Sequence, residues 1–460
     1  MALSVGPNAG GERLPDLHIS RKIMALNEAT RTRLMGSIEA NRLVLLCGAG
    51  LSIPAPSGLM SAIQVSRACY DRYMAIAALP ASMRDNVEEL AGHFYASGEF
   101  ASVFLGLVPW SELIGQPNAG HAAVADFLIC RAAEAVLSAN FDPLIEYWAT
   151  GLKVDMRPAL DGQQATNFGR NHAPLVKFHG CLTLDRERTL WTVGQLTDHT
   201  IAARVESCSQ WMALNLPGKD LLVVGFWTDW GYLNDVIANA LNVAAFNSVT
   251  VVDLKSEADL QTSAPAFWGR LTGGTAHFEH VQQSGADVLS ELRAAFSKVW
   301  AKKFYALGQP MLTAEGKLYS ALVPEMTCDE FYDFRRDAEG MPYHRAAQLK
   351  GPSLGSAAAA FFQLLLIGVN ATRSGSWHEY GGKLVRVIHG AGEAVSTVRE
   401  RYKEPPAVRQ PDIVVCAGAL DIPIPGRVIA SGVGTSVVRP TAGGTTSWLT
   451  LDQARGELHI

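Results

Sequence analysis

The sequence of 460 residues lacks the cysteine spacing of a zinc knuckle. Its seven cysteines are scattered along the chain, and no two of them form a Cys-x-x-Cys pair. Their odd number and irregular spacing also argue against a framework of disulfide bonds. We therefore expect free thiols in a reducing, cytoplasmic setting.

The sequence also lacks an excess of basic residues. It carries 39 Lys and Arg against 44 Asp and Glu, which gives a formal net charge of -5. Proteins that bind nucleic acid directly usually present a strongly basic surface, so direct nucleic-acid binding is not expected.

No stretch has the length and composition of a membrane span. The closest, residues 354–369, contains Ser356 and Gln363 and is too short to cross a bilayer, so it predicts a buried helix. The first twenty residues hold no continuous apolar segment and are expected to form a flexible tail rather than a secretory signal. A hydrophobic content of 48% then indicates a soluble globular protein with two or more domains.

The most informative stretch is an apolar run over residues 43–47 that is followed by Gly48, Ala49 and Gly50. An apolar run without alternation predicts a strand buried on both faces. The glycines allow a sharp turn in which the backbone approaches a pyrophosphate closely, Ser52 is expected to cap the next helix, and the free N–H groups there would bind an anion. A tight turn without a ligand stays open as the alternative, because Gly-x-Gly is common after strands.

Four later apolar segments predict further buried strands, at residues 135–138, 174–178, 220–224 and 248–252. Helical patterns separate them, which favours an α/β fold with a doubly wound, Rossmann-like parallel sheet. In such a sheet the carboxyl ends of the strands form the ligand crevice.

Polar or glycine residues follow each of these strands, and we expect them at that crevice: Asn140, Asp142, His179, Gly225, Phe226 and Asp253. Asp253 is a candidate acceptor for an adenosine ribose hydroxyl, as an acidic residue after a later strand is in dinucleotide folds. Simpler interpretations also stand, since Asp142 could only cap a helix and a lone His179 could be a core residue.

The pattern of apolar, polar and glycine residues divides the rest of the sequence into further segments. Residues 61–110 read as mostly helix and are expected to cover the ligand end of the first strand. Another helix begins after Asn118, its expected N-cap, and His121 is assigned to that helix start. From about residue 300 helices give way to Gly- and Val-rich strands such as residues 412–416 and 427–431. The expected units are a tail (1–20), a catalytic domain (21–300) and a C-terminal α+β domain (301–460).

The motifs, in this order, resemble those of the sirtuin family, in particular its divergent prokaryotic members associated with antiphage defence. The matching segments cover roughly residues 40–255 and are Gly48-Ala49-Gly50-x-Ser52, Pro117-Asn118-x-x-His121, Asn140-Phe141-Asp142, Lys177-x-His179-Gly180 and Val223-Val224-Gly225. The resemblance implies a sirtuin-like (Sir2 superfamily) domain that binds NAD+ as its substrate through both glycine turns.

The resemblance also implies roles for three residues. Asn140 would orient a water or a ribose hydroxyl, and His179, titrating near neutrality, would act as general base. Asp142 would face the carboxamide of nicotinamide and fix the ring.

Departures from the family pattern narrow the expected activity. The two Cys-x-x-Cys pairs of sirtuin deacylases are missing, with only Cys181 and Cys208 in that region, so no zinc is expected. Ala139 stands where deacylases carry glutamine, and Phe226 and Trp227 replace a Thr-Ser pair. These changes put peptide deacylation in doubt but leave the groups needed to break the nicotinamide–ribose bond.

The resemblance therefore implies an NAD+ hydrolase that acts as the effector of an antiphage, abortive-infection system. It also implies a homo-oligomer and a partner protein such as a HerA-type ATPase or a short Argonaute. A zinc-free, NAD-dependent protein deacylase and a non-catalytic sensor of NAD or ADP-ribose remain the alternatives.

Overall fold

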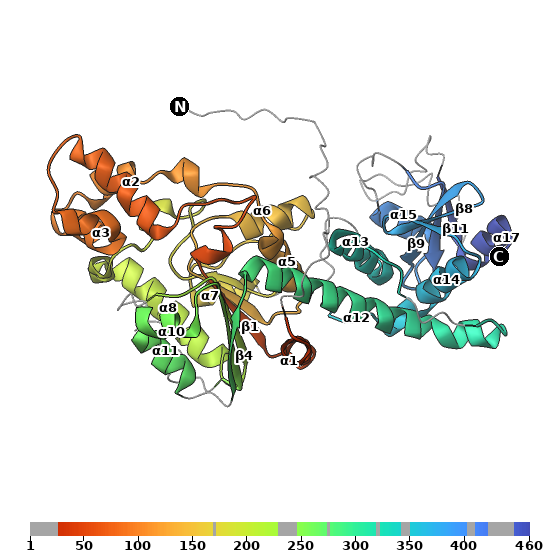
Figure 1. The fold of residues 1–460 in the computed structure, drawn as a ribbon. Coiled ribbons are helices and arrows are strands. Elements are labelled where there is room, and N and C mark those ends of the chain that lie inside the picture. Colours follow the sequence, from red (N-terminus) through yellow and green to blue (C-terminus); the bar gives the residue numbers. More distant parts are fainter. Residues whose placement is uncertain are drawn as a thin grey trace, which may run out of the picture.

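The computed structural model describes residues 26–168, 172–228, 246–273, 277–318, 323–341, 350–402, 410–421 and 446–460. The predicted tail over residues 1–20 and the predicted strand over residues 427–431 lie outside these ranges. The described chain forms two sheets, which the long helix α12 (Gly285–Ala314) connects (Figure 1).

The first sheet has six parallel strands in the order β3-β2-β1-β4-β5-β6. The strands are β1 (Leu43–Cys47), β2 (Ala135–Ser138), β3 (Leu175–Lys177), β4 (Asp220–Val224), β5 (Ser248–Asp253) and β6 (His277–Gln282). The order reverses at β1, whose two neighbours are β2 and β4, and such a reversal opens a crevice at the carboxyl ends of the strands. The predicted α/β fold is confirmed.

Helices cover both faces of this sheet. Leu43, Leu45 and Cys47 of β1 point into one apolar cluster, and Val44 and Leu46 point into another. The first cluster includes side chains of α1 (Glu28–Glu39), α5 (Ala119–Ile129), α6 (Leu144–Gly151) and α12, and the second those of α7 (Gly162–Phe168), α8 (His199–Asn215), α10 (Glu257–Ser263) and α11 (Pro265–Thr272). Burial of both faces explains why the sequence of β1 shows no alternation.

A helical segment lies over the carboxyl edge of the sheet, where the sequence predicts helix. It contains α2 (Ala62–Met74), α3 (Val87–Ala96), a π-helical turn (Phe100–Phe104) and the short α4 (Leu105–Leu107). Ser61 and Asn86 cap α2 and α3. The segment has its own apolar core, in which Phe94 and Phe104 contact each other and Trp191 joins from a later loop. We call residues 59–113 the helical cap.

The second sheet is mixed, with the order β11-β10-β9-β8-β7. Its strands are β7 (Thr372–Ser374), β8 (Trp377–Tyr380), β9 (Lys383–His389), β10 (Ile413–Ala417) and β11 (Ser447–Thr450), accompanied by α13 (Cys328–Glu339), α14 (Ala357–Gly368), α15 (Val395–Arg401) and α17 (Leu451–Leu458). The predicted C-terminal α+β part is thus confirmed, and β10 falls on the predicted strand at residues 412–416.

The apolar stretch at residues 354–369 forms α14, most of whose residues are buried, as the sequence predicts. Within the described ranges, no helix is both long and apolar enough to span a membrane.

The predicted domain boundary at residue 300 falls inside α12. This helix of 30 residues contacts α5 under the first sheet and α14 under the second. One apolar cluster accordingly runs from β1 to β9 and β10. The two sheets therefore share a core, which the change in sequence pattern near residue 300 does not reveal.

A buried ion cluster ties the same elements together. Asp126 of α5 accepts hydrogen bonds from Arg293 Nε of α12, at 2.9 Å, and from Arg335 Nη2 of α13. Asp126 and Arg335 are fully buried, and Arg335 also donates to Ser297 Oγ at 2.7 Å. Burial opposes ionisation of Asp126, but the two guanidinium groups hold the pKa of this carboxyl below its usual range.

Removing the Asp126 carboxylate is expected to destabilise the protein strongly. Asp126→Ala would leave two buried guanidinium groups without their shared acceptor, at a cost of about 3–5 kcal/mol in the free energy of unfolding. Urea denaturation measures this loss. The control is Asp71→Ala, which removes the exposed partner of Arg84 and should barely change the denaturation midpoint. Equal effects of the two substitutions would contradict the assigned role of Asp126.

Candidate active site

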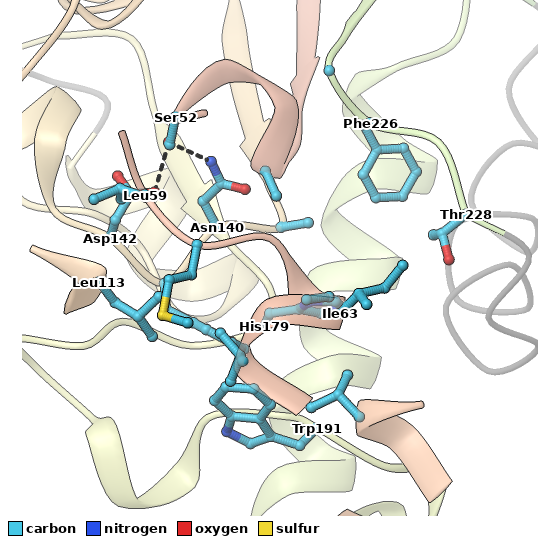
Figure 2. Close-up of a pocket in the computed structure, with 18 of the residues that line it drawn as sticks. Ser52, Leu59, Ile63, Leu113, Asn140, Asp142, His179, Trp191, Phe226 and Thr228 are labelled. Carbon is cyan, nitrogen blue, oxygen red and sulfur yellow. Dashed lines mark hydrogen bonds between the residues drawn. The ribbon is translucent and has the colours of Figure 1, made fainter. Parts of the chain in front are cut away.

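A cavity of about 370 Å³ lies at the carboxyl ends of β1 to β4, beneath the helical cap (Figure 2). Its polar end is formed by residues that follow the strands, and its other walls are largely apolar. The residues that line it are Ala49, Ser52, Leu59, Met60, Ala62, Ile63, Val65, Val87, Leu113, Ala139, Asn140, Phe141, Asp142, His179, Trp191, Gly225, Phe226, Trp227 and Thr228.

The hydroxyl of Ser52 is the centre of the polar end. Its oxygen donates to Asp142 Oδ2 at 2.9 Å and accepts from Asn140 Nδ2 at 3.1 Å. His121 Nε2 lies 3.1 Å from the same oxygen. Ser52 thus joins residues from the turns after β1 and β2 to the start of α5.

The hydrogen bonds of His121 define its protonation. Its Nδ1 accepts from the main-chain N–H of Asn118 at 3.2 Å, so Nε2 carries the hydrogen and donates to Ser52. Burial lowers the pKa of His121 to about 4, a shift that Asp142 opposes and Lys177 reinforces. The imidazole is therefore neutral at pH 7. The sequence assigned His121 mainly to the helix start, with a catalytic role as the alternative, and the structure adds the bond to Ser52.

Asn140 is oriented by two acceptors. Its Nδ2 donates to Gly48 O at 3.1 Å as well as to Ser52 Oγ. The amide oxygen consequently points to the side away from Ser52 and towards the cavity (Figure 2). This arrangement leaves Oδ1 of Asn140 as a fixed acceptor for a bound molecule.

Asp142 lies both at the start of α6 and in the lining of the cavity. Its Oδ1 accepts from the N–H of Leu144 at 3.2 Å, which caps the start of α6, while Oδ2 accepts from Ser52. The side chain is 8% exposed and lines the cavity.

His179 lies in the same cavity, but it does not titrate near neutrality. Only 2% of the residue is exposed, and it is flanked by the rings of Phe178 and Phe141. Burial lowers the pKa of His179 to about 3, against a hydrogen bond with the Ala139 backbone that favours protonation. The expectation of a general base that titrates near pH 7 is therefore wrong for this structure, and His179 is a neutral imidazole.

The two glycine turns lie directly against each other. Gly50 N donates to Gly225 O at 2.8 Å, and Gly48 N donates to Val224 O at 3.1 Å. A Cβ atom on Gly50 would lie 2.7 Å from Gly225 Cα, and one on Gly225, whose φ is +59°, would lie 2.6 Å from Leu51 N. The turns after β1 and β4 therefore cross in direct backbone contact.

This crossing uses the N–H groups that were expected to bind an anion. The N–H groups of Leu51 and Ser52 are also bonded, to Gly48 O and Ala49 O, in a 3₁₀ helix at Ala49–Leu51. No α-helix begins there, and Ser52 does not cap one, because Ser61 caps α2. The N–H groups of Gly48, Gly50, Leu51 and Ser52 therefore donate within the protein, whereas Ala49 of the same turn lines the cavity.

Among the residues assigned to cofactor binding, Ala49, Ser52, Gly225 and Phe226 line the cavity. Gly48, Gly50 and Asp253 do not. Asp253 instead accepts from the N–H of Lys255 at 2.9 Å and so stabilises the turn after β5.

Sequence reasoning missed the apolar wall of the cavity. Trp191 lies against Phe104 of the helical cap and Phe141 of the turn after β2, with ring centroids 5.5 and 4.8 Å away. The cap adds Leu59, Met60, Ile63 and Leu113. No local pattern marks Trp191, because its position depends on a loop that folds back over His179.

Metal ligands were also sought among the described residues, and no group of three or more His, Cys, Asp or Glu side chains could hold a metal ion. Cys181 neighbours Lys177 and Thr183, whereas Cys208 contacts Leu160 O. All seven cysteines are free thiols.

Comparison with known proteins gave no matching family model and no matching curated protein. Solved structures that resemble this chain include a mutant Sir2 homologue with ADP-ribose, at 15% identity over 59% of this chain and 98% of that one, with a TM-score of 0.34. Another is a Sir2 homologue with NAD, at 15% identity over 58% of this chain and 94% of that one, with a TM-score of 0.35. Because both TM-scores lie below 0.5, we base no functional argument on them.

The buried histidines predict that mild acid destabilises the protein. Burial lowers the pKa of His121, His179 and His378 to about 4, 3 and 3. An unfolded histidine titrates near 6.5, so between pH 6.5 and 4 the unfolded chain binds protons that the folded chain does not. The free energy of unfolding should therefore decrease as pH falls, by about 1.4 kcal/mol per pH unit for each histidine.

Urea denaturation between pH 7 and 4.5 measures this dependence. His121→Gln removes one of the three groups and should lower the slope by about 1.4 kcal/mol per pH unit. A slope identical to that of the wild type would show that His121 is already protonated in the folded protein.

Proposed function

We propose that this protein hydrolyses the nicotinamide–ribose bond of NAD+, releasing nicotinamide and ADP-ribose. The observation that carries the proposal is the Ser52 network, which fixes the oxygen of Asn140 towards a largely apolar cavity. Neutral His179 lies in the same cavity. The motif resemblance to the sirtuin family supplies NAD+ as the substrate.

The chemistry of the bond fits such a cavity. When the bond breaks, its electron pair leaves with nicotinamide and positive charge develops on the ribose. The buried carboxylate of Asp142 and the oxygen of Asn140 are negative or partly negative groups, whose effect on a cation is larger in apolar surroundings than in water. Water then attacks the ribose carbon and loses a proton to solvent or to a neighbouring acceptor.

In this proposal Asn140 Oδ1 accepts a hydrogen bond from the attacking water or from a ribose hydroxyl. Neutral His179 is a second acceptor that orients the other of these two groups. A histidine with so low a pKa is a weak base, but attack on an oxocarbenium-like carbon needs little assistance from a base.

We further propose, on the motif resemblance, that the activity serves antiphage defence in the cytoplasm and needs no zinc. Residues 301–460 would act as a sensor or assembly region that keeps the hydrolase silent until it is triggered. A homo-oligomer and a partner such as a HerA-type ATPase or a short Argonaute belong to the same proposal.

Asn140→Ala and His179→Ala are each expected to lower the rate of NAD+ cleavage by about 10²–10⁴-fold, because each removes a positioned acceptor. Chromatographic quantification of nicotinamide and ADP-ribose measures the rate, with and without lysate from phage-infected bacteria. Asn247→Ala is the matched control, since Asn247 precedes β5 at the opposite edge of the sheet and lies outside the cavity, and it should keep the wild-type rate.

The alternatives give different results in the same experiment. Binding of NAD+ without cleavage in every condition would favour the sensor. Cleavage that depends strictly on an acylated peptide would favour the deacylase.

A further inference from the structure

Lys177 is a buried ammonium group directly behind the candidate active site. It is the last residue of β3, its side chain is 1% exposed, and it does not line the cavity. Its Nζ donates to the main-chain oxygen of Asp142 at 2.6 Å and to Glu146 Oε1 at 2.5 Å. Lys177 therefore connects three elements, namely β3, α6 and the turn after β2.

That turn is joined to the neighbouring strand at its first residue, where the N–H of Ala139 donates to Cys47 O of β1 at 3.0 Å. The turn comprises residues 139–143, between the end of β2 and the start of α6. The N–H of Leu182 donates to Phe141 O at 2.9 Å, and Asp142 is held by its side chain and by its main-chain oxygen. Lys177 binds the main-chain oxygen of Asp142, whereas Ser52 binds its side chain.

A contribution to the free energy of unfolding does not explain the ion pair between Lys177 and Glu146. Burying a lysine and a glutamate costs several kcal/mol in solvation, and apolar residues of similar volume are often as stabilising or more so. The backbone ladder between β2 and β3 pairs Val136 with Leu175 and Ser138 with Lys177, and it needs no charged side chain. The Lys177–Glu146 pair instead holds the turn at residues 139–143 in one orientation.

We propose that Lys177 is a positioning residue for the NAD+ cleavage proposed above, and that it acts with Glu146 by fixing the Asp142 peptide group. Through this bond it sets the directions of the Asn140 amide and the Asp142 carboxylate, both of which lie on the same short turn. A displacement of about 1 Å at such a group lowers rates by as much as 10²-fold. The effect of the Lys177–Glu146 pair on the rate of NAD+ cleavage rests on the proposed function. Its effect on the turn rests on the hydrogen-bond geometry alone.

The test replaces both members of the pair, because Lys177→Met alone would leave Glu146 buried and unpaired. The double variant Lys177→Met/Glu146→Leu is apolar, close in volume and expected to fold. The matched control is Arg386→Met/Asp337→Leu, which removes a comparably buried ion pair between α13 and β9, far along the chain from the cavity.

Three measurements are compared between these variants and the wild type: hydrogen exchange of residues 139–147 and of Leu182, the kcat and KM of NAD+ cleavage, and the affinity for ADP-ribose. In the Lys177 variant the exchange of these amides should become about 10-fold faster or more. The kcat should fall by about 10–100-fold while KM and the ADP-ribose affinity change by less than about 3-fold. The control variant should show neither effect.

Unchanged exchange in the turn would overturn the positioning role, whatever the activity. Faster exchange with an unchanged kcat would overturn its catalytic consequence. A wild type that binds ADP-ribose but never cleaves NAD+ would refute the proposed function, and hydrogen exchange would still decide whether Lys177 fixes the turn.

Discussion

The fold depends on one buried carboxylate. Asp126 lies on α5 beneath the parallel sheet, and its two guanidinium partners come from α12 and α13. Because an unpaired charge in an apolar core is so unfavourable, these three helices keep their positions together. His121 lies near the start of the same helix, α5, and contacts Ser52 at the polar end of the cavity. Helix α5 therefore contacts both the cavity, through His121, and the helices next to the second sheet, through Asp126. The two sheets are thus joined by the buried ion cluster as well as by a shared apolar cluster.

Hydrogen bonds between buried polar groups also fix the candidate active site. Ser52 offers one hydrogen and two acceptor positions, and Asp142, Asn140 and His121 use all three. This saturation fixes the His121 tautomer and the Asn140 amide without any bound molecule. Among the described residues that line the cavity, Asp142 is the acidic one, none is Lys or Arg, and His179 is neutral. Such a cavity suits a substrate on which positive charge develops.

The sequence predicted five of the six strands of the parallel sheet and the residues at its carboxyl edge, but not β6, whose residues are only partly buried. Asn140, Asp142 and His179 each follow an apolar run, and parallel strands necessarily bring such residues to one side of the sheet. Their protonation could not be read locally, because the pKa of His179 depends on side chains from several loops. Trp191 and the Lys177–Glu146 pair were missed for the same reason: their partners are distant in sequence. The role of Asp253 stays a prediction, since it follows β5 as expected but does not line the cavity.

The crossing of the Gly48–Gly50 turn with Gly225 has a consequence for mutagenesis. A glycine motif invites substitution by alanine as a probe of ligand binding, but here any added methyl group meets backbone atoms at less than 3 Å. Such a variant would first separate β1 from β4 and deform the sheet, whether or not a ligand ever contacts the turn. Loss of function at these glycines would therefore be uninformative about recognition. Only side chains that project from the turn, such as Ser52, can separate recognition from folding.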